Sequence, residues 1–335
     1  MSQVRSLVSN LHTMSSLHGM IGGLANPLLF GINISMILYG IFLVQVVYYW
    51  TTYERDNVEV KVCVCLLLVL ETCHTVVCLH LLYFYLVLHY GDFQNGITQI
   101  VWSAGTSIYL EISIMCVTES FYLYRIWHLS GRNRTVTAIT SIPVLTRLGI
   151  GIYSNMFVFT FHTWQSLKGS KKAFTMINAT WALSIAADLS VVLVLLYYLY
   201  RNRRAGFGRT RRIMRGLSHY SLSTGVLTLV CSLAVLITFN TNQDTMIYGG
   251  FLEVLSKLYA NSVLAMLNAR QLIVSNAENG FNNTLELSRL HYVPSATLNS
   301  LKPSDGVHAT EERIQLSDHT LSVETDKKGG GSIVV

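Results

Sequence analysis

Several ionisable side chains lie inside long apolar stretches of this chain, where a charge is costly. Glu71 and His74 are three positions apart, so one helical face would carry both, and Glu253 and Lys257 are four positions apart. An acid or base at mid-bilayer depth costs about 2.5–3.5 kcal/mol even on a lenient insertion scale. Ionisable residues at this depth usually pair with one another or have a function. The functions to consider are ion pairing, proton transfer and ligand binding.

The candidate interior polar network or ligand pocket consists of Glu71, His74, Glu111, Arg147, Asp188, Glu253 and Lys257. One interpretation is that these residues only hold helices together, because interhelical polar contacts contribute about 0.6–2 kcal/mol each. The other is a ligand pocket or a proton path, and under that hypothesis Asp188 and Glu71 line it.

Within the predicted membrane interior the acidic residues outnumber the basic ones, so not every acid can be neutralised by a base. One expected pair is Glu253 with Lys257. A second is Arg147 with either Glu111 or Asp188. At least one acid then remains, and it must be protonated or lie beside the histidine.

A separate set of charges is basic and lies in a single predicted loop: Arg201, Arg203, Arg204, Arg209, Arg211, Arg212 and Arg215. Anionic cytoplasmic lipid attracts such a loop by about 1 kcal/mol per residue. The alternative is a docking surface for a cytoplasmic signalling protein. The sequence leaves lipid contact and partner contact open.

The elements that position these residues are seven long apolar stretches. They are Pro27–Trp50, Val62–Leu88, Ile97–Trp127, Val136–Phe161, Phe174–Tyr200, Leu217–Phe239 and Met246–Ile273. A hydrocarbon core about 30 Å thick needs roughly 20 apolar residues per helical crossing, and only closed backbone hydrogen bonding is stable there. We therefore expect an all-α bundle of seven transmembrane helices, with Pro27 at the start of the first.

Composition and loop charge extend this prediction. Hydrophobic residues make up 51% of the 335 residues and charged residues 13%, against about 25% charged in ordinary soluble domains. Eleven Lys and Arg fall in the predicted inside loops and four outside, which places the N-terminus outside and the C-terminus in the cytoplasm. The predicted parts are a short outside N-terminus (1–26), the bundle (27–274) and a disordered cytoplasmic tail (275–335).

All six cysteines lie inside apolar stretches, which is typical of small, reduced core residues. We therefore expect no metal site and no structural disulfide. No pairing of a nucleophile with a base is evident, so neither catalysis nor a cofactor is predicted. The expected partners are the lipid bilayer, a small-molecule ligand and a cytoplasmic signalling protein, and not nucleic acid. The bilayer is expected to be the plasma membrane or an endomembrane.

Short motifs follow one another along the predicted bundle: Leu38-Tyr-Gly40 with Gln45, Leu70-Glu-Thr72 with Thr75, Tyr124-Arg-Ile-Trp127, Ala186-Ala-Asp188, Thr224-Gly-Val-Leu-Thr228, Lys257-Leu-Tyr-Ala-Asn-Ser262 and Leu267-Asn-Ala-Arg270. In this order and spacing the chain resembles a large family of basidiomycete seven-pass membrane proteins that share a domain of unknown function. The resemblance implies the fold and a membrane location. It implies no activity and assigns no role to any residue.

Three functions remain open on the sequence. A receptor-like, sensory role rests on topology, on the basic loop and on a tail rich in Ser and Thr. A small-solute or proton-coupled transporter would use the buried acids. A retinal-binding protein is the third, because Glu253-x-x-x-Lys257 imitates the acid and Schiff-base lysine of microbial rhodopsins.

Overall fold

The computed structural model describes the backbone of residues 2–89, 98–205, 208–242 and 245–291. It describes side chains over residues 26–89, 98–202, 222–242, 245–271 and at 273. The elements are α1 (Ser2–Thr52), α2 (Val58–Tyr83) continued by a short π-helix η1 (Phe84–Leu88), α3 (Trp102–Leu129), α4 (Arg134–Thr160), α5 (Trp164–Gly169), α6 (Lys171–Ala205), α7 (Gly208–Thr241) and α8 (Ile247–His291). Across the described backbone, β pairing is limited to one isolated bridge between Gln99 and Thr163. The predicted all-α class is confirmed.

Helix starts and turns follow local side-chain chemistry. The Asn133 side chain caps α4 by accepting hydrogen bonds from the backbone N–H groups of Thr135 and Val136. Thr163 caps α5 in the same way. The tight turn from α3 to α4 uses Gly131 and Arg132 at φ values of 70° and 64°, a left-handed conformation that glycine adopts without steric cost.

Two predicted boundaries are wrong. Pro27 lies inside α1, which begins at Ser2, and so it does not start that helix. The last helix does not end near Ile273 but continues to His291. The chain divides into one unit of Met1–Ser275 and another of Asn276–Val335. The rest of the tail predicted to be disordered, residues 292–335, lies outside the described residues.

The seven predicted stretches correspond to α1, α2 with η1, α3, α4, α6, α7 and α8. Five helical segments are long and apolar enough to cross a membrane: Asn26–Thr52, Val58–Leu88, Arg134–Thr160, Lys171–Asn202 and Leu222–Thr241. These segments lie in α1, α2 with η1, α4, α6 and α7. They indicate a membrane protein.

Exposed large hydrophobic side chains show why α3 and α8 differ from those five. Among the described residues, all of these side chains lie on the five segments except Trp102 of α3 and Phe251 of α8. The five segments therefore carry apolar outer faces suited to lipid. α3 and α8 instead carry buried charged residues, including Glu111, Glu119 and Lys257. Their sequences are therefore less apolar, and these charges face other helices of the protein.

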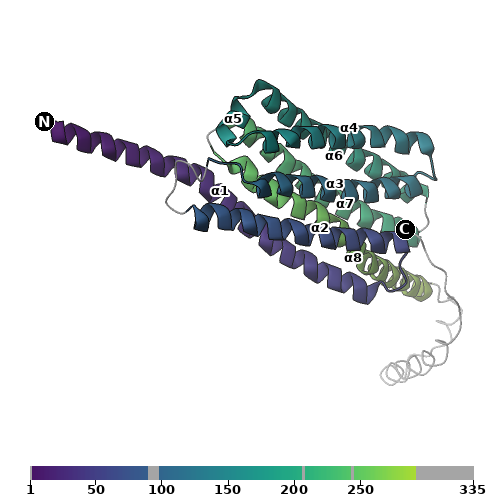
Figure 1. The fold of residues 1–335 in the computed structure, drawn as a ribbon. Coiled ribbons are helices and arrows are strands. Elements are labelled where there is room, and N and C mark those ends of the chain that lie inside the picture. The colour runs from purple at the N-terminus through teal and green to yellow at the C-terminus, as the bar shows by residue number, and fades with distance from the viewer. Residues whose placement is uncertain (1, 90–97, 206–207, 243–244, 292–335) are drawn as a thin grey trace, which may run out of the picture. The chain divides into compact units, whose positions relative to one another are not determined.

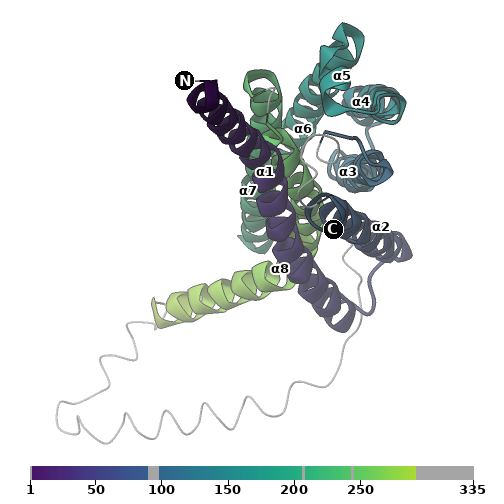
Figure 2. The same ribbon diagram turned by 60° about the vertical axis from the view of Figure 1, so that its left-hand side comes forward.

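Neighbouring helices pack along their lengths. In Figures 1 and 2 α3, α4 and α6 run side by side, and α7 lies against α6. One apolar cluster joins α1 to α8 through side chains that include Phe42, Tyr49 and Leu264. These two helices also approach closely where glycines face each other, because a Cβ added to Gly31 would lie 2.4 Å from the Gly250 Cα. Small residues permit such backbone contact between helices.

Candidate functional site

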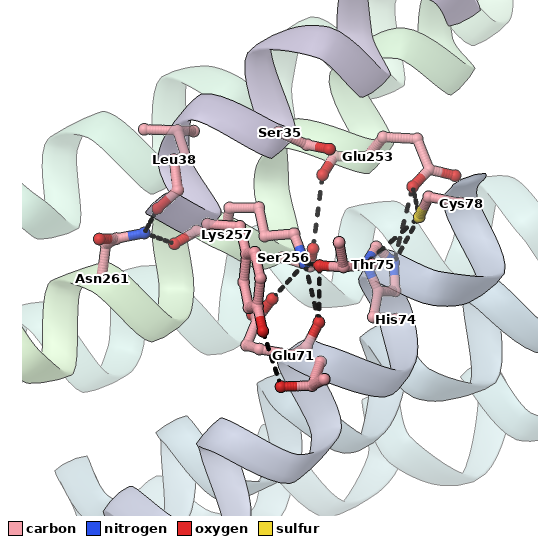
Figure 3. Close-up of polar contacts among 12 residues, drawn as sticks. Ser35, Leu38, Glu71, His74, Thr75, Cys78, Glu253, Ser256, Lys257 and Asn261 are labelled. Atoms are coloured by element: carbon pink, nitrogen blue, oxygen red, sulfur yellow. Dashed lines mark hydrogen bonds and ion pairs between the residues drawn. The ribbon is translucent and has the colours of Figure 1, made fainter. Parts of the chain in front are cut away.

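Lys257 on α8 is fully buried, and α2 supplies its polar partners. Its Nζ lies 2.5 Å from Glu71 Oε2 and donates to Thr75 Oγ1 at 2.9 Å. The ammonium also lies 5.3 Å from the centre of the Tyr39 ring, and the Tyr39 hydroxyl is bonded to Thr72 at 2.8 Å. Figure 3 shows the lysine pointing from α8 toward Glu71 and Thr75. The contact neutralises both charges where neither side chain is accessible to solvent.

Glu253 does not pair with Lys257, so that predicted pair is wrong. Its Oε2 lies 3.6 Å from His74 Nε2 and accepts a hydrogen bond from the Cys78 thiol at 2.8 Å. Cys78 Sγ is also 3.4 Å from His74 Nδ1. His74 and Cys78 are four positions apart on α2 and share a face, as Figure 3 shows. The i, i+4 spacing places Glu253 and Lys257 on one face of α8, but the facing helix α2 supplies the partner of each.

The second predicted ion pair, that of Arg147, is also wrong, because the acid differs from the two expected. Arg147 of α4 binds Glu119 of α3 at 2.5 Å, and not Glu111 or Asp188. The other end of its guanidinium lies 2.8 Å from Met115 Sδ. Asp188 of α6 instead accepts a hydrogen bond from the Tyr259 hydroxyl of α8.

A cavity of about 80 Å³ lies among α3, α4, α5, α6, α7 and α8. Its wall is mostly apolar, and two tryptophans contribute to it, Trp164 of α5 and Trp181 of α6. The volume exceeds the roughly 10–15 Å³ needed to hold one water molecule. Concave, largely apolar spaces with a few polar groups are typical of small-molecule sites.

The polar atoms on this wall include acceptors that the protein leaves unused. Within the described part of the chain, Glu111 Oε1, Asn155 Oδ1 and Ser184 Oγ are buried without a hydrogen-bond partner. Asn155 is oriented by its amide, which donates to the Gly105 carbonyl oxygen at 2.9 Å. Among the same described residues, the Nε donor of Arg147, which also lines the cavity, is a fourth buried polar atom without a partner. Buried polar atoms are nearly always bonded, so four unpaired ones on residues that line one cavity indicate a place for a bonding partner.

The structure does not bring all predicted site residues to one place. Glu111 and Arg147 line the cavity. Asp188 lines a smaller one of about 30 Å³ with Glu119 and Tyr259, whereas Glu71 lies in the lysine contact. Asp188 and Glu71 therefore line no common cavity among those described.

Of the basic-loop residues, Arg201 is exposed at the end of α6. The remaining six have side chains outside the described residues: Arg203, Arg204, Arg209, Arg211, Arg212 and Arg215. Their role in lipid or partner contact stays a prediction.

An ion pair further along α8, near the middle of the helix, was not predicted. Arg270 binds Asp56 of the α1–α2 loop through both terminal nitrogens, at 2.5 and 3.2 Å. The Tyr53 ring lies 4.6 Å from its guanidinium carbon, and the Tyr53 hydroxyl donates to the Asn268 carbonyl oxygen. Partial burial in this contact raises the pKa of Tyr53, while Arg270 opposes the shift. The loop is thereby tied to α8.

Sequence reasoning missed Cys78, Asn155, Ser184 and Tyr259. The spacing of His74 and Cys78 is a signal that could have identified the first. For the other three no local pattern separates them from ordinary helix residues, because their partners come from helices distant in sequence.

Fold and site together define an all-helical protein with five candidate membrane-spanning segments and a buried polar interior. Residues 184–272 match the family described as "Family of unknown function (DUF6534)". That segment extends from the middle of α6 through α7 into α8 and includes Ser184, Asp188, Glu253, Lys257 and Tyr259. Neither a curated protein nor a solved structure matches the chain.

Proposed function

We propose that this chain is a seven-pass, receptor-like membrane protein that binds a small molecule in the cavity of about 80 Å³ and signals to a cytoplasmic partner. The observation that carries the proposal is the apolar wall with three unpaired buried acceptors, Glu111, Asn155 and Ser184. A fitting ligand is small and mostly apolar and carries a hydrogen-bond donor, such as an alcohol or an amine. An amine would in addition meet the carboxyl group of Glu111.

In this proposal α3 and α8 cross the membrane as well as the five apolar segments. Both are long enough, since 28 residues in α3 and 45 in α8 exceed the roughly 20 needed. Their buried polar groups account for the lower hydropathy. The loop charges favour an outside N-terminus, and the resemblance to seven-pass basidiomycete proteins supports the same count. A reporter fused after α2, α3, α7 and α8 in turn tests this, and a reporter that stays on one side across α3 contradicts it.

Ligand binding can be tested by filling the cavity from one wall. Ser184→Leu places a larger side chain among the lining residues, whereas Ala182→Leu on the same helix adds equal bulk at an exposed position. Thermal shifts are measured in nanodiscs with 1-octanol, octylamine and octane as probes. We expect stabilisation by the alcohol or the amine in the wild type and in Ala182→Leu, and none in Ser184→Leu. Equal shifts in all three proteins would indicate partition into lipid and overturn the proposal.

The cytoplasmic step rests on the basic segment from Arg201 to Arg215. Co-purification with heterotrimeric G proteins is compared between the wild type and a variant in which these seven arginines are replaced by glutamine. Loss of co-purification, with unchanged membrane insertion, supports a partner surface. Unchanged co-purification means that the segment contacts lipid only.

A transporter is the second candidate, and the buried contacts between α2 and α8 favour it. Lys257 with Glu71 and His74 with Glu253 place four titratable groups between two helices. Proteoliposome flux that depends on pH and is lost in Glu71→Gln would support it. A retinal protein is the weakest candidate, since Glu71 and Thr75 hold the Lys257 amine and Lys257 is not among the cavity-lining residues. Expression with added retinal and no visible absorbance would exclude it.

A further inference from the structure

We propose that His74, Cys78 and Glu253 form a zinc-binding site that joins α2 to α8. This inference does not depend on the ligand cavity, because none of the three residues lines it. It goes against the expectation from sequence that the chain has no metal site. That expectation considered cysteines only as neighbours along one helix.

The three side chains present their donor atoms to one point. One donor atom from each lies within 4.8 Å of the other two. His74 Nε2 is 3.6 Å from Glu253 Oε2 and 3.9 Å from Cys78 Sγ, and the sulfur and oxygen are 2.8 Å apart. Figure 3 shows the imidazole, the thiol and the carboxylate converging between the two helices.

These distances suit a tetrahedral ion. Zinc binds sulfur at about 2.3 Å and nitrogen or oxygen at about 2.0–2.2 Å, so two of its ligands lie roughly 3.3–3.6 Å apart. The two edges to His74 Nε2 already approach this spacing. The sulfur–oxygen edge is shorter because the Cys78 thiol donates a hydrogen bond to Glu253. Replacing that proton by the ion requires this edge to open by less than about 1 Å.

The donor types and their charges also favour zinc. Thiolate, imidazole and carboxylate are the zinc ligands in proteins, and three of them with one open position are typical of accessible zinc centres. Binding releases the thiol proton to solvent, so Cys78 and Glu253 carry two negative charges that balance the dication. All three residues are buried, with 4% exposure or less, and a site without net charge avoids most of the cost of a buried ion. The adjacent Lys257 is already neutralised by Glu71.

Bound zinc would act as a cross-link between helices that are far apart in sequence. The ion would fix α8 against α2 at the level where Lys257 also contacts α2. The fourth position would take water or a small ligand.

The test uses the full chain in detergent, purified through a tag without histidine and stripped with EDTA. Cobalt(II) replaces zinc in such sites and reports on them by visible d–d bands and a thiolate-to-metal charge-transfer band in the near ultraviolet. We expect both signals in the wild type at one ion per chain, and their loss when zinc is added. Cys78→Ser should remove the charge-transfer band. Cys73→Ser should retain it, because Cys73 is exposed on the same helix.

Two further variants test the site if Cys78→Ser fails to fold. Glu253→Gln and His74→Gln preserve side-chain size, and each should weaken zinc affinity at least about tenfold. Wild-type protein that remains monodisperse after stripping yet shows no charge-transfer band overturns the proposal. A band that persists in Cys78→Ser overturns it too, because the thiolate is then another cysteine.

Discussion

The Lys257 ammonium lies 2.5 Å from the Glu71 carboxylate, although 186 positions of sequence separate the two residues. The pair is fully buried, and Thr75 takes a further donor of the lysine. It therefore connects the second helix to the last one at a point where neither charge can reach water.

Removing one member of this pair should destabilise the bundle more than removing both. Lys257→Met leaves the Glu71 carboxyl without its partner, and we expect a loss of about 3–5 kcal/mol. Lys257→Met combined with Glu71→Gln should recover most of that loss, because no unpaired charge remains. The free energy of unfolding in detergent is the measurement. Lys171→Met at an exposed position is the control and should change it by less than about 0.5 kcal/mol. A double variant as unstable as the single one would contradict the explanation.

The close approach of α1 and α8 depends on two glycines. An alanine Cβ at Gly250 would lie 2.4 Å from the Pro27 carbonyl oxygen, and backbone atoms have no room to yield. We expect Gly250→Ala and Gly31→Ala each to cost about 1–3 kcal/mol through forced separation of the helices. Gly40→Ala has nothing within 4 Å of the new Cβ and should be neutral or more stable by up to about 1 kcal/mol. Thermal unfolding of the three variants, measured side by side, decides between these outcomes.

The contact of Arg270 with Asp56 should require a guanidinium and not merely a positive charge. Two parallel N–H donors reach the carboxylate, and lysine cannot reproduce this geometry. Arg270→Lys is therefore expected to lower the free energy of unfolding by about 1–2 kcal/mol. It should also speed proteolysis of the α1–α2 loop. Arg201→Lys, the same substitution at an exposed position, is the control and should change neither measurement. Equal protease sensitivity in the two variants would show that the ion pair does not hold the loop.

Tyr259 should matter through its hydroxyl as well as its ring. The hydroxyl donates to Asp188, which is buried. Tyr259→Phe keeps the ring but leaves the Asp188 carboxyl with one donor fewer, at a cost of about 1–3 kcal/mol. Tyr197→Phe removes a hydroxyl from an exposed tyrosine on α6 and should have little effect. Chemical unfolding in mixed micelles measures both, and equal stability of the two variants would argue against the hydrogen bond.

Helix type and approximate position could be predicted because they depend on local composition. Each long apolar stretch became a helix, and the errors fell at ends such as Pro27, where no apolar pattern marks the boundary. The candidate site was predicted less well. Glu111 and Arg147 do line the cavity, but Asn155 and Ser184 complete it from α4 and α6 with no signal in their own segments.

The order of apolar residues along the chain was enough to predict an all-helical membrane protein with buried charges. Exposing unpaired backbone groups or charges to lipid is unfavourable in every segment taken by itself, so each segment can be interpreted from its own sequence. Which charge meets which depends on how helices distant in sequence face one another. Glu253 and Lys257 lie on one face of α8, yet the first meets His74 and Cys78 and the second meets Glu71. Interactions at 2.5–4 Å are decided by packing between helices, and no local pattern along a single helix contains that information.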